Sequence, residues 1–166
     1  TIKDNSITIK TEEIKGVNIE TAPFPGFPTD LQAPFTALML KATGKSIIKE
    51  TIFENRMNHI DLLKKMGASI RSENNIAIVS GVKKLSGRKL KGSDLRSTAA
   101  IIIAALTADN PSLVEGLEHL DRGYENFECK LKKLGADIKR DLTVNISNNS
   151  CKDDFLINDV QDIYAA

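Results

Sequence analysis

Residues that build metal centres, disulfide frameworks and membrane spans are scarce in this sequence. Among its 166 residues there are two cysteines, two histidines and no tryptophan. Cys129 and Cys151 lack the spacing of metal ligands, and the polar first ten residues do not resemble a signal peptide, so we expect reduced thiols and no bound metal. The longest apolar run, residues 99–106, is far too short to cross a bilayer. These absences predict a globular, cytoplasmic protein outside the membrane.

An excess of charge of one sign is also lacking. Lys+Arg total 23 and Asp+Glu total 22, which leaves a formal net charge of +1. We therefore expect no general attraction to nucleic acid or to an anionic membrane surface. Any functional role of charge in this chain must be local.

An internal repeat organises the chain. Residues 29–31 and 93–95 share a hydroxyl-Asp-Leu pattern, followed in the same order by a helical stretch, a β-rich segment, an arginine-bearing turn and a Lys-Lys-x-Gly-Ala segment. Each copy predicts a helix-strand-helix-strand-strand unit. Strands are predicted at residues 46–48, 77–79, 112–114 and 143–146. The repeat therefore indicates an α/β fold built by duplication.

The repeat also predicts how the chain is divided. Residues 6–10 resemble residues 75–79 at the end of the first copy, which indicates that the chain begins in the tail of an earlier repeat of a longer protein. Residues 1–150 then form one partial domain. Its parts are a repeat tail (1–28), a first repeat (29–92) and a second repeat (93–150), followed by a tail of unknown role (151–166).

Local signals mark the ends of the predicted helices. Asp30 and Asp94 each follow a hydroxyl residue just before a helical stretch, where an aspartate caps exposed backbone N–H groups well. Gly67 and Gly135 follow amphipathic stretches and are predicted to end those helices. Residues 95–106 are apolar almost all round, which predicts a helix buried inside the domain.

Four motifs resemble those of the UDP-N-acetylglucosamine 1-carboxyvinyltransferase family. They are residues 21–33 (TAPFPGFPTDLQA), 50–56 (ETIFENR), 93–96 (SDLR) and 119–125 (HLDRGYE). The resemblance implies two similar domains, each an inverse α/β barrel of three repeats around buried helices, with the active site between them. This chain would then supply about two and a fraction repeats of the C-terminal domain. The N-terminal domain, which completes a monomeric enzyme, would be absent from it.

The family transfers the enolpyruvyl group of phosphoenolpyruvate to the 3-hydroxyl of UDP-N-acetylglucosamine, the first committed step towards peptidoglycan. This chemistry needs a base at the sugar hydroxyl and cations around phosphoenolpyruvate, and no cofactor. By resemblance Asp30 is the base and Asp94 lies beside the reacting centre. Arg96 and Arg122 are expected to bind phosphoenolpyruvate, with Arg122 on its carboxylate.

The resemblance also implies a site for the nucleotide sugar. It assigns five residues to this site: Thr29, Asp30, Ile52, Phe53 and Arg56. Phe53 also fits a packing role, and Arg56 is expected to anchor the closed cleft. Asp121 and Glu54 are expected to be structural partners of the neighbouring arginines.

Structural roles are an alternative for several of these residues. Asp30 by itself is also a good helix cap, and a lone arginine at a helix start is usually a solvated surface residue. The related 5-enolpyruvylshikimate 3-phosphate synthases carry K-E-x-D-R and D-H-R-M-A-M motifs, which residues 50–56 and 94–99 do not match. A non-catalytic remnant acting as a binding module is a further alternative. In either case we expect the isolated chain to be inactive.

Overall fold

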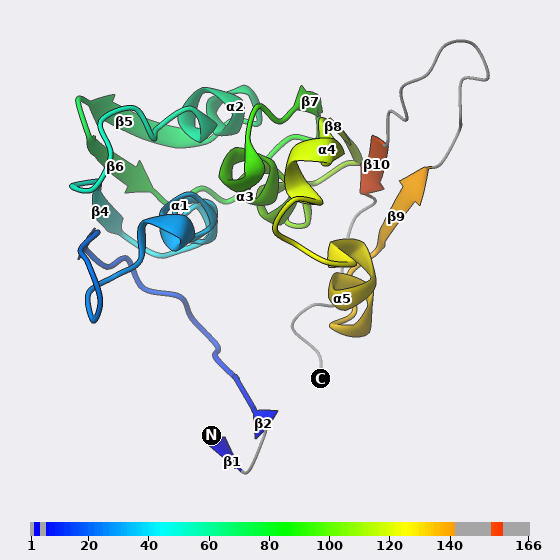
Figure 1. The fold of residues 1–166 in the computed structure, drawn as a ribbon, viewed down its shortest axis with the longest axis horizontal. Coiled ribbons are helices and arrows are strands. Elements are labelled where there is room, and N and C mark those ends of the chain that lie inside the picture. The colour runs from blue at the N-terminus through cyan, green and yellow to red at the C-terminus, as the bar shows by residue number, and fades with distance from the viewer. Residues whose placement is uncertain (1, 4–5, 142–153, 158–166) are drawn as a thin grey trace.

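The computed structural model describes residues 2–3, 6–141 and 154–157. Two four-stranded sheets flank a central layer of helices (Figure 1). Two of these helices, α1 (Gln32–Met39) and α3 (Leu95–Ala105), lie between the sheets. None of the helices in the described ranges is long and apolar enough to span a membrane. The chain is therefore an α/β protein, as the alternation of predicted helices and strands indicates.

The first sheet has the strand order β3-β4-β6-β5. Its strands are β3 (Ile19–Glu20), β4 (Lys45–Lys49), β5 (Ser69–Glu73) and β6 (Ile76–Ser80). β3 runs parallel to β4, and the other pairs are antiparallel. Along β4, Ser46 and Ile48 are buried whereas Ile47 is exposed, because successive side chains of a strand point to opposite faces. One face of this sheet thus packs against α1 and α2 (His59–Lys65). The 3-10 turn η1 (Thr29–Leu31) precedes α1 and contacts it.

The second sheet has the equivalent order β7-β8-β10-β9. Its strands are β7 (Lys89–Lys91), β8 (Ser112–Glu115), β9 (Ile138–Asp141) and β10 (Asp154–Ile157). β7 is parallel to β8, and β10 is antiparallel to both of its neighbours. β10 lies in the predicted tail of residues 151–166 and fills the place that β6 has in the first sheet. The strand predicted at 143–146 falls outside the described residues.

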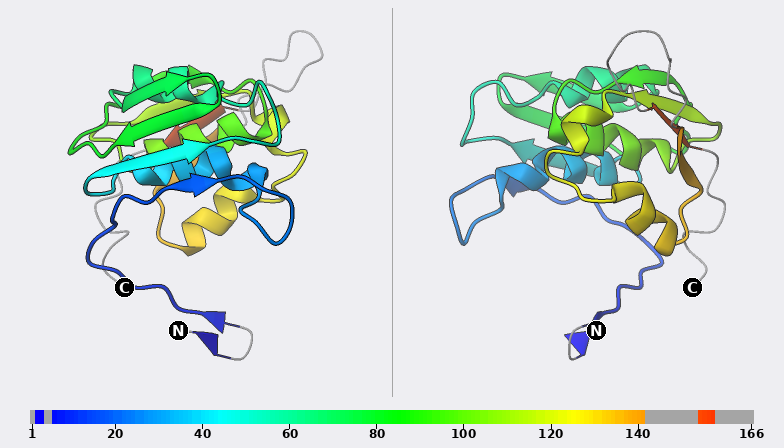
Figure 2. Two further views of the ribbon diagram at one scale, coloured as in Figure 1. Left: turned by 90° about the vertical axis from the view of Figure 1, so that its left-hand side faces the viewer. Right: turned by 45° about the vertical axis from the view of Figure 1, so that its right-hand side comes forward.

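Two short helices and a hairpin complete the structure. α4 (Leu117–Leu120) and α5 (Phe127–Lys133) connect β8 to β9. At the other end of the chain, β1 (Ile2–Lys3) and β2 (Ser6–Ile7) form an antiparallel hairpin that stands apart from the body in each view of Figure 2.

The buried helix α3 forms the centre of the core. Its residues Ala99, Ala100, Ile101 and Ile102 are at most 1% exposed. Small alanine side chains let neighbouring helices approach closely, and α3 packs most extensively against α1 and then α2. Burial of apolar surface in this way stabilises the fold by roughly 25 cal/mol for each Å² removed from water. The predicted burial of residues 95–106 is confirmed.

Three helix ends follow the local signals, namely the start of α3 and the ends of α2 and α5. Asp94 caps α3, because its Oδ1 accepts hydrogen bonds from the backbone N–H groups of Arg96 and Ser97 at 2.9 and 3.0 Å. The Ser97 Oγ atom in turn accepts a hydrogen bond from the backbone N–H of Asp94 at 3.2 Å, which completes a capping box. Gly67 and Gly135, both with φ of +95°, follow α2 and α5 in the left-handed conformation that glycine tolerates. These predictions are confirmed.

The predicted cap at Asp30 is wrong. Asp94 has an extended backbone (φ −158°, ψ 168°) that places its carboxylate over the first N–H groups of α3. Asp30 lies inside the 3-10 turn η1 that precedes α1, and neither helix receives a side-chain cap. The residue before α1 is Leu31, and three positions further on Pro34 has no N–H to be capped. The carboxylate of Asp30 is instead bound to arginine side chains.

Candidate functional site

Three loops that precede helices meet at one end of the helical layer. They lead into α1, α2 and α3 and bring together residues from three of the sequence motifs. A small pocket of about 210 Å³ opens between them. It is lined by Ala33, Asn55, Arg56, Asn58, His59, Asp94, Arg96 and Ser97. Polar and charged side chains dominate this lining, which suits an ionic ligand better than an apolar one.

Asp30 and two arginines form the charged centre of this region. The Oδ1 atom of Asp30 accepts a hydrogen bond from Arg96 Nε at 2.7 Å and lies 2.6 Å from Arg96 Nη2. Arg56 Nη1 approaches the same oxygen at 3.6 Å. The other oxygen, Oδ2, has no hydrogen-bond partner among the described residues, and the Asp30 side chain is 68% exposed. One carboxylate oxygen is thus held by cations while the second remains open to a ligand.

Arg56 is fixed from two further sides. Its Nη1 donates to Thr29 Oγ1 at 2.8 Å, and its guanidinium lies 3.5 Å from the centre of the Phe53 ring. Burial and the nearby charge of Arg96 lower the pKa of Arg56, while Asp30 and Glu50 act in the opposite direction. An arginine nevertheless stays protonated in proteins. Arg56 is therefore a permanent, oriented cation at the pocket wall.

Asp94 lines the pocket while it caps α3. Burial opposes its ionisation, but hydrogen bonds from Ser97, Arg96 and Ser93 outweigh burial and lower the pKa of Asp94. Its negative charge is thus stabilised by N–H and O–H groups rather than by a salt bridge. This arrangement places a fixed carboxylate beside Arg96.

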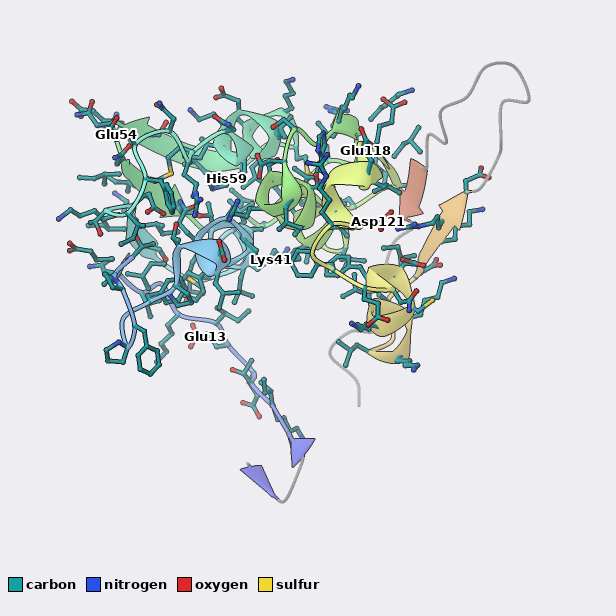
Figure 3. The ribbon with its side chains drawn as sticks, in the orientation of Figure 1. Glu13, Lys41, Glu54, His59, Glu118 and Asp121 are labelled. Carbon is teal, nitrogen blue, oxygen red and sulfur yellow. The ribbon has the colours of Figure 1, made fainter. Side chains whose placement is uncertain are left out.

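His59 is a buried pocket residue that sequence reasoning missed. It begins α2 and is 2% exposed, and Figure 3 places it between α2 and α3. Burial lowers the pKa of His59 from 6.5 to about 4, although the charge of Asp94 acts against this shift. Its Nε2 is buried without a hydrogen-bond partner in the described part of the chain. The one sequence signal was its place next to Ile60, in the amphipathic stretch that Gly67 ends.

Glu50 is a second buried residue that sequence reasoning missed. The sequence placed it in the motif of residues 50–56 but assigned it no role. Glu50 is 2% exposed and accepts four hydrogen bonds. Its Oε1 accepts from Thr21 Oγ1 at 2.9 Å, from Ile52 N at 2.8 Å and from Phe53 N at 3.2 Å. Its Oε2 accepts from Thr29 Oγ1 at 2.7 Å. Glu50 therefore joins the loop before η1 to the loop after β4.

The three predicted arginines do not all meet. Arg56 and Arg96 share Asp30, whereas Arg122 is exposed and makes no hydrogen bond or ion pair within the described residues. Arg122 still lies near the start of α3, since a Cβ on the adjacent Gly123 would be 2.9 Å from Leu95 Cδ2. Two residues further on, burial and the charge of Asp30 raise the pKa of Tyr124.

The prediction that Asp121 and Glu54 pair with the neighbouring arginines is wrong. Asp121 forms a bidentate pair with Arg140, with distances of 2.7 and 3.1 Å, and not with Arg122. Glu54 is exposed and has no partner within the described ranges. In Figure 3, Glu54 and Asp121 lie on opposite sides of His59. No three His, Cys, Asp or Glu side chains of the described residues are grouped so that they could hold a metal ion.

The sequence matches a known family over most of its length. A family model described as EPSP synthase (3-phosphoshikimate 1-carboxyvinyltransferase) matches residues 1–141, and the chain belongs to this family. It is 70% identical over 141 residues to UDP-N-acetylglucosamine 1-carboxyvinyltransferase of Prochlorococcus marinus (strain MIT 9312), and 53% identical over 141 residues to the protein of that name from Synechococcus sp. (strain CC9605). Both alignments cover 85% of this chain but only 31% and 33% of those relatives. The chain spans about a third of their length.

Solved structures agree with this assignment. The enolpyruvyl transferase NikO from Streptomyces tendae matches with a TM-score of 0.68 and 28% identity, over 76% of this chain and 30% of that one. EPSP synthase from Acinetobacter baumannii matches with a TM-score of 0.59 and 15% identity, over 84% of this chain and 30% of that one. The second likeness concerns the fold alone.

Proposed function

We propose that this chain is part of a UDP-N-acetylglucosamine 1-carboxyvinyltransferase, which moves the enolpyruvyl group of phosphoenolpyruvate to the 3-hydroxyl of UDP-N-acetylglucosamine. The observation that carries the proposal is the meeting of Asp30, Arg56 and Arg96 around one carboxylate oxygen. These residues come from three separate motifs. The high identity to relatives with this name supports the same substrates.

The proposed architecture is a partial inverse α/β barrel. Helices α1 and α3 lie inside and the two sheets lie outside, which supports such an arrangement (Figure 1). The chain would supply most of a C-terminal domain, and the family's N-terminal domain would form the other wall of the cleft. The complete enzyme is proposed to act as a cytoplasmic monomer without a cofactor, early in peptidoglycan precursor synthesis.

Asp30 is proposed to act as the general base. A base must reach the sugar hydroxyl with a free oxygen, and Oδ2 of Asp30 is free of protein partners within the described residues. Arg96 and Arg56 hold Oδ1 and so fix the orientation of the carboxylate. Asp94 is proposed to lie beside the reacting centre, where its charge is already stabilised by hydrogen bonds.

Arginines are proposed to bind phosphoenolpyruvate. Arg96 uses Nε and Nη2 for Asp30, which leaves Nη1 to donate to a phosphate or carboxylate oxygen. Arg122, which is exposed near the start of α3, is proposed to bind the carboxylate with its planar fork. Thr29, Ile52, Phe53 and Arg56 are proposed to line the nucleotide-sugar site with Asp30.

Phosphate release tests this function. A full-length protein carrying this chain is expected to release phosphate from phosphoenolpyruvate only when UDP-N-acetylglucosamine is present. Shikimate 3-phosphate is the control acceptor, and turnover with it in place of the nucleotide sugar would support the synthase alternative. We expect the chain alone to be inactive, because it covers about a third of its relatives. Turnover by the isolated chain at ordinary enzyme rates would contradict the two-domain proposal.

A further inference from the structure

We propose that Glu50 is a positioning residue of this site. Its buried carboxylate fixes the direction of the Thr29 hydroxyl and, through Thr29, holds Arg56 beside Asp30. The proposal rests on the proposed function for its kinetic consequence, but the geometry that carries it belongs to this chain alone. Glu50 would touch no substrate and would act only through the residues that it holds.

Four hydrogen-bond donors surround the carboxylate of Glu50. Two threonine hydroxyls and two backbone N–H groups point at its two oxygens. An ionised carboxylate only accepts hydrogen bonds and has room for all four, whereas a protonated carboxyl would place a donor against one of them. Burial opposes the charge, but the bonds from Thr29, Ile52, Thr21 and Phe53 prevail and lower the pKa of Glu50.

The direction of the Thr29 hydroxyl then follows from its two neighbours. Arg56 Nη1 donates to Thr29 Oγ1 at 2.8 Å, and a guanidinium cannot accept. The single hydroxyl proton of Thr29 must therefore point at Glu50 Oε2, 2.7 Å away. A directed chain results, in which Arg56 donates to Thr29 and Thr29 donates to Glu50.

The same logic holds for the second threonine. The backbone N–H of Thr51 donates to Thr21 Oγ1 at 2.9 Å, so the Thr21 hydroxyl proton is directed at Glu50 Oε1. The Thr51 hydroxyl in turn donates to the Thr21 carbonyl. One buried anion thus orders both loops, and it also attracts Arg56. Arg56 connects these loops to the candidate site, because its Nη1 lies 3.6 Å from Asp30 Oδ1.

The Glu50→Gln variant separates positioning from folding. The amide oxygen best replaces Oε1, which keeps the three donors there, so the amide nitrogen faces Thr29. Thr29 must then accept from this nitrogen as well as from Arg56, and its own proton turns away. Arg56 loses the attraction of the buried charge and shares its acceptor. We expect the loops to remain folded while Arg56 is loosened.

The first experiment needs no substrate. In this chain, NMR would follow solvent exchange of the Arg56 guanidinium protons and of the Ile52 and Phe53 amides. Glu50→Gln is expected to speed Arg56 exchange about tenfold or more, as the loss of one charge-assisted bond implies, with little change at the two amides. Glu20→Gln is the matched control, since Glu20 is an exposed carboxylate of the same sheet paired with Lys49, and should change neither.

The second experiment measures kinetics in a full-length protein carrying the chain. Glu50→Gln is expected to raise the KM for UDP-N-acetylglucosamine about tenfold, with the KM for phosphoenolpyruvate nearly unchanged. Thr29→Val removes the intermediate hydroxyl, so adding Glu50→Gln to it should have a smaller effect than Glu50→Gln alone, because only the attraction of the buried charge for Arg56 is left to lose. Independent, multiplying effects of the two changes would overturn the directed chain.

The two experiments fail in different ways. If the protein does not use these substrates, the proposed function fails, and Arg56 exchange still decides the role of Glu50. Unchanged Arg56 exchange in a folded Glu50→Gln chain would overturn the proposal. If Glu50→Gln does not fold, Thr29→Val replaces it, because it leaves Glu50 with three donors. Thr29→Val is then expected to speed solvent exchange of the Arg56 guanidinium protons. Unchanged Arg56 exchange in this variant would overturn the proposal.

Discussion

Replacing Asp30 by Asn tests the centre of the proposed site most directly. The amide keeps an oxygen and nearly the same volume but loses the negative charge that Arg96 and Arg56 bind. Because the Asp30 side chain is 68% exposed, these ion pairs should contribute only about 0–1 kcal/mol to stability. Asp30 also caps no helix, so the variant should melt close to the parent. As a general base, Asp30 should contribute about 10²–10⁴-fold to turnover.

The assay combines three measurements on a full-length protein carrying the chain. We expect a normal thermal melt, a nucleotide-sugar affinity changed by less than about tenfold, and phosphate release reduced at least about 100-fold. Asp109→Asn is the matched control, because Asp109 is an exposed carboxylate paired with Lys84 beyond the far end of α3. It should leave all three unchanged. Near-normal turnover of a folded Asp30→Asn protein would refute the assignment of the base.

Two further predictions concern Arg122 and His59. In the full-length protein, Arg122→Lys should weaken phosphoenolpyruvate use by about 2 kcal/mol, since lysine lacks the planar fork. Equal losses for both substrates in steady-state kinetics would instead make Arg122 structural. His59 binds its proton less tightly in the folded protein than in the unfolded chain, since its pKa is about 4 in the fold against 6.5. The contribution of neutral His59 to the free energy of unfolding is therefore complete above pH 6.5 and is lost as the pH falls towards 4. Urea denaturation should show that this residue lowers the free energy of unfolding by about 2 kcal/mol at pH 5 relative to neutral pH. His59→Leu should remove this part of the pH dependence of stability.

Features with a local cause follow from the sequence. The cap at Asp94 needs only Ser97 three residues later, and the helix ends at Gly67 and Gly135 need only a residue that tolerates positive φ. The burial of α3 follows from its apolar residues on every side. At the cap and the helix ends the interacting groups lie within one helical turn, so the spacing of residues is sufficient evidence, and for α3 the composition is sufficient.

Features that depend on distant segments do not follow. Asp30 and Asp94 occupy equivalent places in the sequence repeat, yet one binds arginines and the other caps a helix. The difference arises because Asp30 lies inside η1 and not at a cap position, where Arg96, 66 residues away, reaches it. The pairing of Asp121 with Arg140 likewise depends on the place of β9, which packs against α5. Glu50 and His59 are polar residues that a sequence alone would place at the surface, and they are buried because distant segments pack over them.

The charges of the site explain why this chain should need another protein segment. Arg56, Arg96 and Arg122 provide three cations at the start of the helices, while Asp30, Asp94 and Glu50 provide three carboxylates. Burial keeps His59 uncharged at neutral pH, so it adds no cation. Phosphoenolpyruvate carries both a phosphate and a carboxylate, and a site without net positive charge would bind it weakly. Under the proposed function, we therefore propose that the family's N-terminal domain supplies the further cations from the opposite wall of the cleft.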